Sequence, residues 1–445
     1  MRTVKISMLG AGSFFVLTIA KELLKNPVFN NCTFMLMDVA QDRLDVAKSS
    51  VEELFTPETN KINLETSTDI AKALDGADYV ISSCEKNRYA FWAQDFRIAE
   101  ANGVYQIKGE NGGPAGLIHS LRQICLYKDI LEEIKKRCPN AWWMNFSNPM
   151  STLCTYAKNY FPTVKTLGFC HQVHGSFGLI AEELGMKPGE LEVISAGVNH
   201  LNWLFDIRKK GTGVSCMDEF IEKISKSQYW HKVFKNIPPQ TLTLDLYNTF
   251  KMYPIGYDEH IVEYMPFMHD PEQWESYGLH SHAKDVENMC NSHTHTLEMI
   301  KGQEGTPDKP PFPVDPDDPY YAENPCEVIS ALETNTPLFL DAINIKNNGA
   351  VDNLPADVIL DVPAVIIGGE ARSVHVGALP PLPCEVCRRQ TVLHEMIAQG
   401  AAEGNDDLIV QALCLDPYVC SFQKAKALWA DYRKAYAAEL TTFKK

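Results

Sequence analysis

A glycine-containing turn near the amino terminus constrains the fold more than any other feature of the sequence. The turn contains Gly10 and Gly12, and it lies between an apolar segment at residues 3–9 and a helical pattern. A second apolar segment, residues 32–37, follows the helical pattern and ends at Asp38. A strand, a tight turn, a helix and another strand in this order predict a βαβ unit with parallel strands.

The alternation continues beyond this unit. Helical patterns alternate with further strand-like segments at residues 79–83, 141–145 and 166–169. Regular alternation of strands and helices is typical of an α/β fold with a doubly wound parallel sheet of the Rossmann type. The first half of the chain is therefore expected to form such a sheet.

The pattern changes after about residue 192, where longer helical segments mix with short strands. We therefore expect a Rossmann-type domain at residues 1–195 and an α+β domain at residues 196–445. Residues 306–325 contain seven prolines and several acids. This segment is expected to form a surface excursion from the second domain, because proline fits neither a helix interior nor a central strand.

The charge and the cysteines narrow the classes of partner and compartment. The chain has 57 acidic and 41 basic residues, a formal net charge of -16. A negative field repels phosphate backbones and anionic lipids, so neither nucleic acid nor a membrane is an expected partner. The 13 cysteines are scattered along the chain, as in proteins of a reducing compartment. With neither a signal-peptide pattern nor a long apolar run, we expect a soluble, cytoplasmic protein.

The turn itself predicts a dinucleotide site. Gly10 and Gly12 let the backbone approach a pyrophosphate, which binds at the start of the following helix. Asp38 can accept hydrogen bonds from a ribose diol, and its charge favours NAD over NADP. Phe15 stands where the usual fingerprint has its third glycine. A glycine turn in another kind of α/β protein is the alternative.

Three other segments carry side chains suited to chemistry. Cys170 and His200 could bind a transition metal, although two such residues alone are more typical of a protein core. Asn148 follows a predicted strand and precedes a proline, so its amide could be aimed at substrate hydroxyls or could belong to a plain turn. Glu110, in a glycine-rich loop, and the cluster at residues 257–260 could supply acid or base groups, or could be surface loops.

Together these segments resemble glycoside hydrolase family 4, the NAD- and metal-dependent glycosidases, whose fold is similar to that of lactate and malate dehydrogenases. The resemblance runs nearly end to end, and its most specific parts are Gly-Phe-Cys-His at residues 168–171 and Ala-Gly-Val-Asn-His-Leu at residues 196–201. Further matching segments are residues 10–13, 145–149, 348–349, 361–364 and 412–417. The resemblance favours a metal site over a core pair at Cys170 and His200.

The resemblance implies a reaction that combines redox and elimination chemistry. Oxidation of the sugar C3 hydroxyl by bound NAD acidifies the C2 proton, a base removes that proton, and the aglycone leaves from C1. Water then adds, and the stored hydride reduces the ketone, so NAD is regenerated in each turnover. Mn²⁺ or another divalent metal would act as a Lewis acid on the C2 and C3 oxygens.

The resemblance also implies roles for individual residues. Cys170 and His200 would bind the metal, Glu110 would be the acid that assists the leaving group, and Tyr257 or Asp258 would be the C2 base. The proposed cofactor-binding residues are Gly10, Gly12, Ser13, Phe14 and Asp38. The proposed substrate-binding residues are Asn148, His171 and Asn199.

The sugar and the oligomer are less constrained. The residues around Cys170 are closer to those of members that act on unphosphorylated glycosides, although Arg88, Arg97 and Lys108 could form a basic cluster in space. Family members are usually dimers or tetramers, so a homodimer or homotetramer is expected. The alternatives are an NAD-dependent dehydrogenase of sugars or 2-hydroxy acids, with net hydride transfer, and an NAD-binding regulator without catalytic activity.

Overall fold

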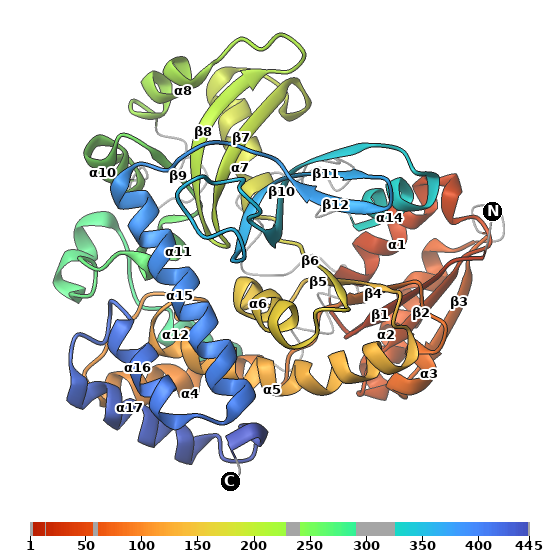
Figure 1. Ribbon diagram of the computed structural model, residues 1–445, viewed down its shortest axis with the longest axis horizontal. Helices are drawn as coiled ribbons and strands as arrows, with labels where there is room; N and C mark the ends of the chain where they lie inside the picture. The colour runs from red at the N-terminus through yellow and green to blue at the C-terminus, as the bar shows by residue number, and fades with distance from the viewer. Residues whose placement is uncertain (1–2, 14, 57–60, 228–240, 291–324, 444–445) are drawn as a thin grey trace.

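The computed structural model describes most of the chain (Figure 1). The described residues are 3–13, 15–56, 61–227, 241–290 and 325–443. Phe14 and residues 306–324 of the predicted proline-rich excursion lie outside them. None of the described helices combines the length and the apolar character needed to cross a lipid bilayer.

The first half of the chain forms the predicted parallel sheet. Its strands follow the order β3-β2-β1-β4-β5-β6, and every neighbouring pair is parallel. The strands are β1 (Lys5–Leu9), β2 (Thr33–Met37), β3 (Asn63–Ser67), β4 (Tyr79–Ser82), β5 (Trp142–Asn145) and β6 (Lys165–Gly168). The sequence analysis missed β3, because this edge strand is exposed or half-buried along its length and carries no apolar run.

Helices cover both faces of this sheet (Figure 1). The helix α1 packs against α2 and α14, whereas α3 packs against α5, and α5 against α6. The helices of the first half are α1 (Phe15–Lys25), α2 (Gln41–Leu54), α3 (Ile70–Leu74), α4 (Arg88–Ala101), α5 (Gly113–Arg137) and α6 (Met150–Tyr160). The strand order reverses between β1 and β4, and at such a switch point the carboxyl ends of the strands open a crevice.

The second half contributes both long and short antiparallel strands, so the expectation of short strands alone is wrong. Four of its strands, β7, β8, β10 and β11, have 8 or 9 residues each. The strands are β7 (Leu191–Val198), β8 (Leu201–Lys209), β9 (Tyr253–Ile255), β10 (Leu338–Lys346), β11 (Ile359–Ile367) and β12 (Glu370–Ser373). Most of their residues are buried on both faces, which hides the alternation that marks a half-exposed strand.

One sheet runs through both halves. The strand β10 pairs with β6 where Asn344 opposes Gly168, and β11 pairs with β7 where Asp361 opposes Gly197. The expected boundary between residues 195 and 196 lies inside β7. The division into two domains stays a prediction.

Some helices of the second half pack on this sheet, and others pack on helices of the first half. The helices are α7 (Gln172–Leu184), α8 (Met217–Ile224), α10 (Thr241–Phe250), α11 (Asp258–Ile261), α12 (Ala283–Cys290), α14 (Pro325–Thr334), α15 (Pro381–Glu403), α16 (Asp406–Leu415) and α17 (Phe422–Ala435). Short 3₁₀ turns are η1 (Pro27–Phe29), η2 (Pro188–Glu190), η3 (Val262–Tyr264), η4 (Pro271–Gln273), η5 (Glu275–Tyr277) and η6 (Thr441–Phe443). The long helix α15 packs against α5, α6 and α16, so it ties the carboxyl-terminal helices to the first half.

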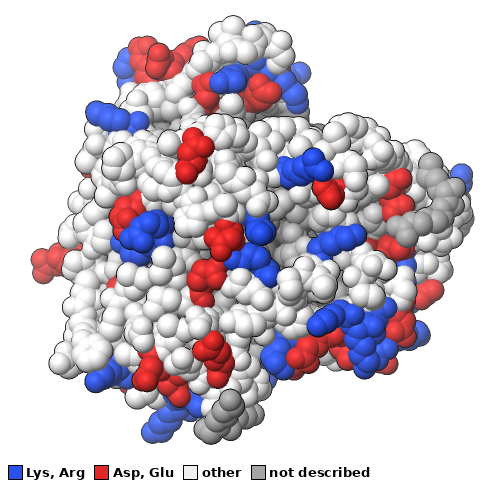
Figure 2. Space-filling model, in the orientation of Figure 1, with Lys and Arg blue, Asp and Glu red and all other residues white. Residues whose placement is uncertain are grey.

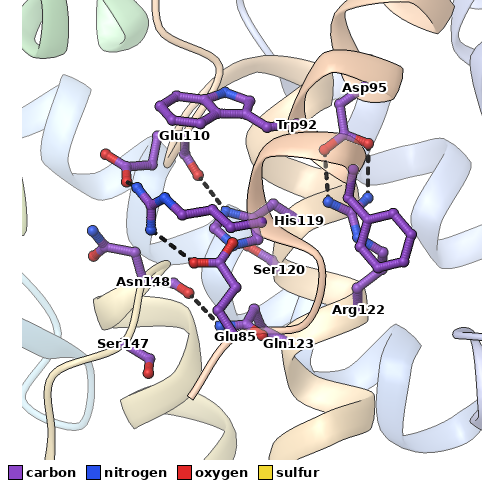
Figure 3. Close-up of polar contacts among 12 residues, drawn as sticks. Glu85, Trp92, Asp95, Glu110, His119, Ser120, Arg122, Gln123, Ser147 and Asn148 are labelled. Atoms are coloured by element: carbon purple, nitrogen blue, oxygen red, sulfur yellow. Dashed lines mark hydrogen bonds and ion pairs between the residues drawn. The ribbon is translucent and has the colours of Figure 1, made fainter. Parts of the chain in front are cut away.

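Charged side chains form small mixed groups on the surface, and one charged pair is buried in the interior. Figure 2 shows Lys, Arg, Asp and Glu side chains interspersed in small groups on one face. In the interior, Arg122 of α5 makes two hydrogen bonds of 2.7 and 2.6 Å to the carboxylate of Asp95 in α4 (Figure 3). The hydroxyl of Tyr436 donates to the same carboxylate at 2.5 Å. This buried pair joins α4, α5 and the chain segment after α17.

Removal of one member of this pair is expected to destabilise the fold strongly. Asp95→Ala leaves the Arg122 charge buried without its counter-ion, which costs about 3–5 kcal/mol of unfolding free energy. Urea denaturation followed by circular dichroism measures this loss. Glu222→Gln, which removes the exposed ion pair with Lys226, is the control and should leave the transition unchanged. Equal transitions for the Asp95 and Glu222 variants would contradict the prediction.

Candidate active site

The turn after β1 has the close contacts that only glycine permits. Gly10 has a φ of +76°, and a Cβ atom there would lie 2.2 Å from the carbonyl oxygen of Ser83. A Cβ atom at Gly12 would lie 2.7 Å from Oδ2 of Asp38. The Gly12 N–H donates a 2.9 Å hydrogen bond to that same oxygen. The predicted residues Gly10, Gly12 and Asp38 therefore lie together at the carboxyl ends of β1, β2 and β4.

The surroundings of this turn fit a dinucleotide. Oγ of Ser13 is buried and has no hydrogen-bond partner among the described residues. It lies just before α1, at the helix end that attracts phosphate groups. Val39, directly after Asp38, is 85% exposed, which is unusual for an apolar side chain beside a buried carboxylate. Phe15, at the position of the missing third glycine, packs its ring 5.2 Å from that of Phe146.

Asn148 lies at the same sheet edge, after β5. Its peptide bond to Pro149 is cis. Its backbone carbonyl accepts a 3.0 Å hydrogen bond from Nε2 of Gln123 in α5. In Figure 3 the side-chain amide points away from Gln123, to the side on which the Glu110 carboxylate lies.

His200 lies at the tip of the β7–β8 hairpin in a left-handed conformation, with a φ of +67°. A non-glycine residue in this region carries strain of about 1 kcal/mol or more, and such strain is common at functional sites. Three contacts hold the tip in place. Nε2 of Gln172 donates to the His200 carbonyl at 3.1 Å, the Tyr264 hydroxyl donates to the Asn199 carbonyl at 3.0 Å, and the Asn111 amide lies 2.8 Å from Nδ1 of His200.

Three side chains converge beside this hairpin tip. Potential ligand atoms of Glu110, His200 and His260 all lie within 4.8 Å of one another, and all three residues are buried. The two imidazole rings stand edge to face, with centroids 4.3 Å apart. Cys170, the other predicted metal ligand, is half-buried at the end of β6 and is not a member of this group of three.

The Glu110 carboxylate is held as an anion. Nη2 of Arg88 donates to Oε1 of Glu110 at 2.6 Å, and Nη1 of Arg88 donates to Oε2 of Glu85 at 2.7 Å. Figure 3 shows Glu85 and Glu110 turned toward the same guanidinium group. Burial alone would raise the pKa of both carboxyls, but Arg88 lowers the pKa of Glu85 to about 2 and that of Glu110 well below 4.5. An ionised Glu110 disagrees with the expected role of a proton donor.

The loop that carries Glu110 is fixed to the second half of the chain. The backbone N–H of Glu110 donates a 3.0 Å hydrogen bond to Oε1 of Glu263. Glu263 is 2% exposed, and burial, reinforced by the nearby Glu110 charge, raises its pKa well above 4.5. A Cβ atom at Gly112 would lie 2.9 Å from the Glu263 carbonyl oxygen, so the loop packs directly on η3.

A second ion-pair network borders the cluster. Nζ of Lys108 lies 2.7 Å from Oε1 of Glu259, and Nε2 of His282 lies 2.8 Å from Oε2 of the same carboxylate. Nε2 of His260 faces Glu259 at 3.9 Å. Of the three basic residues considered from the sequence, Arg88 and Lys108 approach Glu110, whereas Arg97 is exposed and pairs with Glu287.

The two candidates for the C2 base have different surroundings. Oδ1 of Asp258 accepts hydrogen bonds from the backbone N–H of Thr243, at 3.2 Å, and from the Thr243 hydroxyl, so the carboxylate caps the first turn of α10. Burial raises the pKa of Asp258 to about 6. Tyr257 packs against α7, where a Cβ atom on Gly175 would lie 3.5 Å from its hydroxyl oxygen.

The two remaining predicted substrate residues differ in exposure. His171 is exposed at the start of α7. Asn199 is 3% exposed, and neither atom of its side-chain amide has a hydrogen-bond partner among the described residues. From the sequence, Glu259 and His260 are predicted only as possible acid or base groups, and Glu85 has no predicted role. The contact between Lys108 and Glu259, 151 positions apart, is one that no local sequence pattern indicates.

Comparisons with known proteins agree with this architecture. The model of the family 4 glycosyl hydrolases matches residues 5–186, and the model of the family's C-terminal domain matches residues 195–419. An α-galactosidase from Rhizobium meliloti (strain 1021) is 27% identical over 452 residues, which cover 96% of this chain and 87% of that protein.

Solved structures show the same fold. A 6-phospho-β-glucosidase from Thermotoga maritima, determined with manganese, NAD⁺ and glucose-6-phosphate, has a TM-score of 0.80 at 18% identity, over 98% of this chain and 99% of that one. A malate dehydrogenase from Plasmodium falciparum, determined with NADH, has a TM-score of 0.50 at 11% identity, over 93% and 99% of the chains. The predicted likeness to malate dehydrogenase is thus confirmed for the fold.

The buried histidines make stability depend on pH. Burial lowers the pKa of His174, His260 and His394 to about 4, below the value of about 6.5 in an unfolded chain. As the pH falls from about 6.5 to about 4, the unfolded state takes up protons that the folded state does not bind. The unfolding free energy therefore decreases over this range, by up to about 3 kcal/mol for each histidine.

Urea denaturation at several pH values measures this decrease. His394→Gln, in α15 and away from the cluster, should flatten the curve between pH 7 and pH 5. A slope as steep as that of the wild type would show that folding does not lower the pKa of His394.

Proposed function

The chain belongs to family 4 of the glycosyl hydrolases, and from this premise we propose that it hydrolyses an uncharged glycoside with the help of bound NAD and a divalent metal, Mn²⁺ by analogy with the relatives. One observation carries the proposal: the glycine turn with Asp38, the amide of Asn148 and the cluster around His200 all lie at the same edge of one sheet. The T. maritima relative, whose structure contains NAD⁺ and manganese, has this fold.

The residues present fit both groups. The Gly10–Gly12 turn, the buried Ser13 hydroxyl and Asp38 would hold NAD, and Phe14, which lies outside the described residues, stays a predicted contact. Cys170 and His200 would hold the metal, because a thiolate and a neutral imidazole are suitable donors for a divalent transition metal. When bound, NAD supplies a hydride acceptor and the metal supplies a Lewis acid.

Tyr257 is the better candidate for the base that removes the C2 proton. Asp258 is committed to the amino terminus of α10 through its contacts with Thr243. Its carboxylate can turn to a substrate only if that cap is lost, at a cost of about 1 kcal/mol. We therefore assign proton transfer to Tyr257 and a structural role to Asp258.

Glu110 as the leaving-group acid stays a prediction. This role requires a protonated carboxyl, whereas Arg88 holds Glu110 ionised. Substrate binding would have to separate the two side chains before Glu110 could donate a proton. As a carboxylate, Glu110 is better suited to accept a hydrogen bond from a sugar hydroxyl or to bind a cation.

Asn148, His171 and Asn199 are the proposed sugar-binding residues. The Asn148 amide has both a donor and an acceptor for sugar hydroxyls. The unpartnered amide of Asn199 also fits such a role, since a buried amide normally has a hydrogen-bond partner. His171 lies at the exposed side of the same edge.

The charges near the cluster support an uncharged sugar. Arg88 pairs with Glu85 and Glu110, and Lys108 pairs with Glu259. A phosphate or carboxylate on the sugar would have to compete with these acids for each cation. The α-galactosidase from R. meliloti, a relative along nearly the whole chain, is consistent with an uncharged hexoside.

We also propose that the protein acts in the cytoplasm as a homodimer or homotetramer. Support for the compartment comes from the cysteines, because the 12 whose side chains the structure describes form no disulfide bonds with one another. Light scattering on the purified protein measures its molar mass and therefore the number of subunits.

Assays with a panel of p-nitrophenyl α- and β-glycosides test the function. The panel contains glucosides, galactosides, glucuronides and 6-phosphoglucosides, assayed under reducing conditions with and without NAD and Mn²⁺ while absorbance at 340 nm is followed. We expect aglycone release that needs both additives, is highest for an uncharged sugar and occurs without stoichiometric NADH. NADH accumulation without aglycone release would instead assign the chain to the dehydrogenases.

Two variants distinguish the candidate bases. Tyr257→Phe should abolish exchange of the C2 proton with solvent deuterium, measured by NMR, while NAD binding and the unfolding transition stay close to wild type. Asp258→Asn should retain the exchange and instead lower the unfolding transition, because the cap of α10 is weakened. Exchange that survives in Tyr257→Phe and is lost in Asp258→Asn would reverse the assignment.

A further inference from the structure

We propose that His260 and Glu110 bind the divalent metal together with His200, so that the metal site contains two imidazoles and a carboxylate. The inference rests on the proposed function, in which a metal acts at this site, and it adds two ligands to the pair Cys170 and His200.

The geometry of the three side chains is the first argument. Their potential ligand atoms lie within 4.8 Å of one another, and Nδ1 of His260 lies 4.0 Å from Oε2 of Glu110. Ligand atoms that share one metal ion at bond lengths of about 2.1 Å are separated by about 3–4 Å. Small side-chain movements would therefore bring all three atoms to one ion.

A buried nitrogen atom of His260 also supports the metal site. Nδ1 of His260 is buried and has no hydrogen-bond partner among the described residues, and the whole residue is 9% exposed. A buried polar atom without a partner costs free energy, and coordination of a metal ion would offset that cost. Because Nε2 of this ring faces Glu259, the Nδ1 lone pair is directed to the side of Glu110.

Each of the three side chains has a second polar atom that would not bind the metal. In each case this atom contacts another residue, which we call the outer partner. The Asn111 amide contacts Nδ1 of His200 at 2.8 Å, which leaves Nε2 for the metal. Because Nδ1–H must donate when Nε2 binds a metal, the Asn111 oxygen would occupy this contact.

The other two outer partners are charged. Glu259, itself held by Lys108 and His282, faces Nε2 of His260. Arg88 binds Oε1 of Glu110 and leaves Oε2 for the metal. Metal-binding histidines characteristically use their second nitrogen in this way, with an amide, a carboxylate or a carbonyl.

The donor set also indicates the class of metal. Two nitrogen donors and one carboxylate suit Mn²⁺, Fe²⁺, Co²⁺ or Zn²⁺ better than Mg²⁺, which prefers oxygen donors alone. Cys170 is not within the group of three, so its contribution is tested separately.

Electron paramagnetic resonance of Mn²⁺ bound to the full-length protein tests the inference. Titration with Mn²⁺ in the presence of NAD gives the Kd, and pulsed measurements of ¹⁴N coupling report how many imidazoles bind the ion. We expect coupling to two imidazole nitrogens in the wild type. His260→Gln should reduce this to one and raise the Kd by at least about tenfold.

The control and a second variant keep the test decisive. His394 is also buried with an unpartnered Nδ1, but it lies in α15, so His394→Gln should leave the Kd and the nitrogen coupling unchanged. Glu110→Gln should raise the Kd as His260→Gln does. If His260→Gln does not fold, the number of nitrogens coupled in the wild type still decides the question.

Two outcomes would contradict the role of His260, and only the second would also contradict the proposed function. Coupling to a single imidazole, with a Kd that His260→Gln leaves unchanged and Cys170→Ser raises, would overturn the role of His260 and retain the metal-dependent function. A wild-type protein that binds no Mn²⁺ while it hydrolyses glycosides would contradict both.

Discussion

The candidate site depends on the loop at residues 109–113, because this loop of the first half contacts residues of the second half beside the His200 cluster. The backbone of Glu110 is bonded to Glu263, its carboxylate is bonded to Arg88, and the next residue, Asn111, contacts His200. Gly112 packs so closely on η3 that no side chain fits there. A shift of this loop would therefore move the carboxylate, the imidazole and the start of α5 together.

Charge compensation decides what this site can do. Its cations are already paired with acids, and its two inner histidines are held neutral, since burial lowers the pKa of both His200 and His260. A neutral imidazole has a lone pair for a metal, and the ionised Glu110 provides negative charge at low solvent exposure. The arrangement suits a divalent cation with an uncharged sugar better than it suits an anionic sugar.

Much of the fold follows from the sequence, because local patterns mark local structure. The βαβ unit, the strands β4 to β6 and the turn at Gly10 are each specified by neighbouring residues, and the structure contains all of them. The edge strand β3 lacks an apolar run, and most residues of the long strand β11 are buried on both faces, so neither strand gives a clear periodic signal. The continuation of the sheet from β6 to β10 joins residues 176 positions apart (344 minus 168), which no local pattern reports.

The same limit applies to the site. Motif resemblance indicated candidate residues such as Asn148 and His200, but not the charged partners of Glu110 and Glu259. Arg88 is 22 positions from Glu110, and Lys108 is 151 positions from Glu259. The first pair depends on the packing of the Glu110 loop against the start of α4, and the second depends on the packing of loops from both halves. The cap that Asp258 provides for α10 also depends on tertiary structure. It distinguishes Asp258 from Tyr257, whereas no sequence pattern favoured either residue as the C2 base.

In the proposed function, one edge of the sheet binds the cofactor, the metal and the sugar together. Diffraction from crystals grown with NAD, Mn²⁺ and a slowly hydrolysed glycoside, measured at the manganese absorption edge, would show all three. We expect one anomalous peak within bonding distance of His200, with the nicotinamide ring and the sugar both beside Asn148. An ordered NAD with the manganese peak absent, or located away from His200, would contradict it.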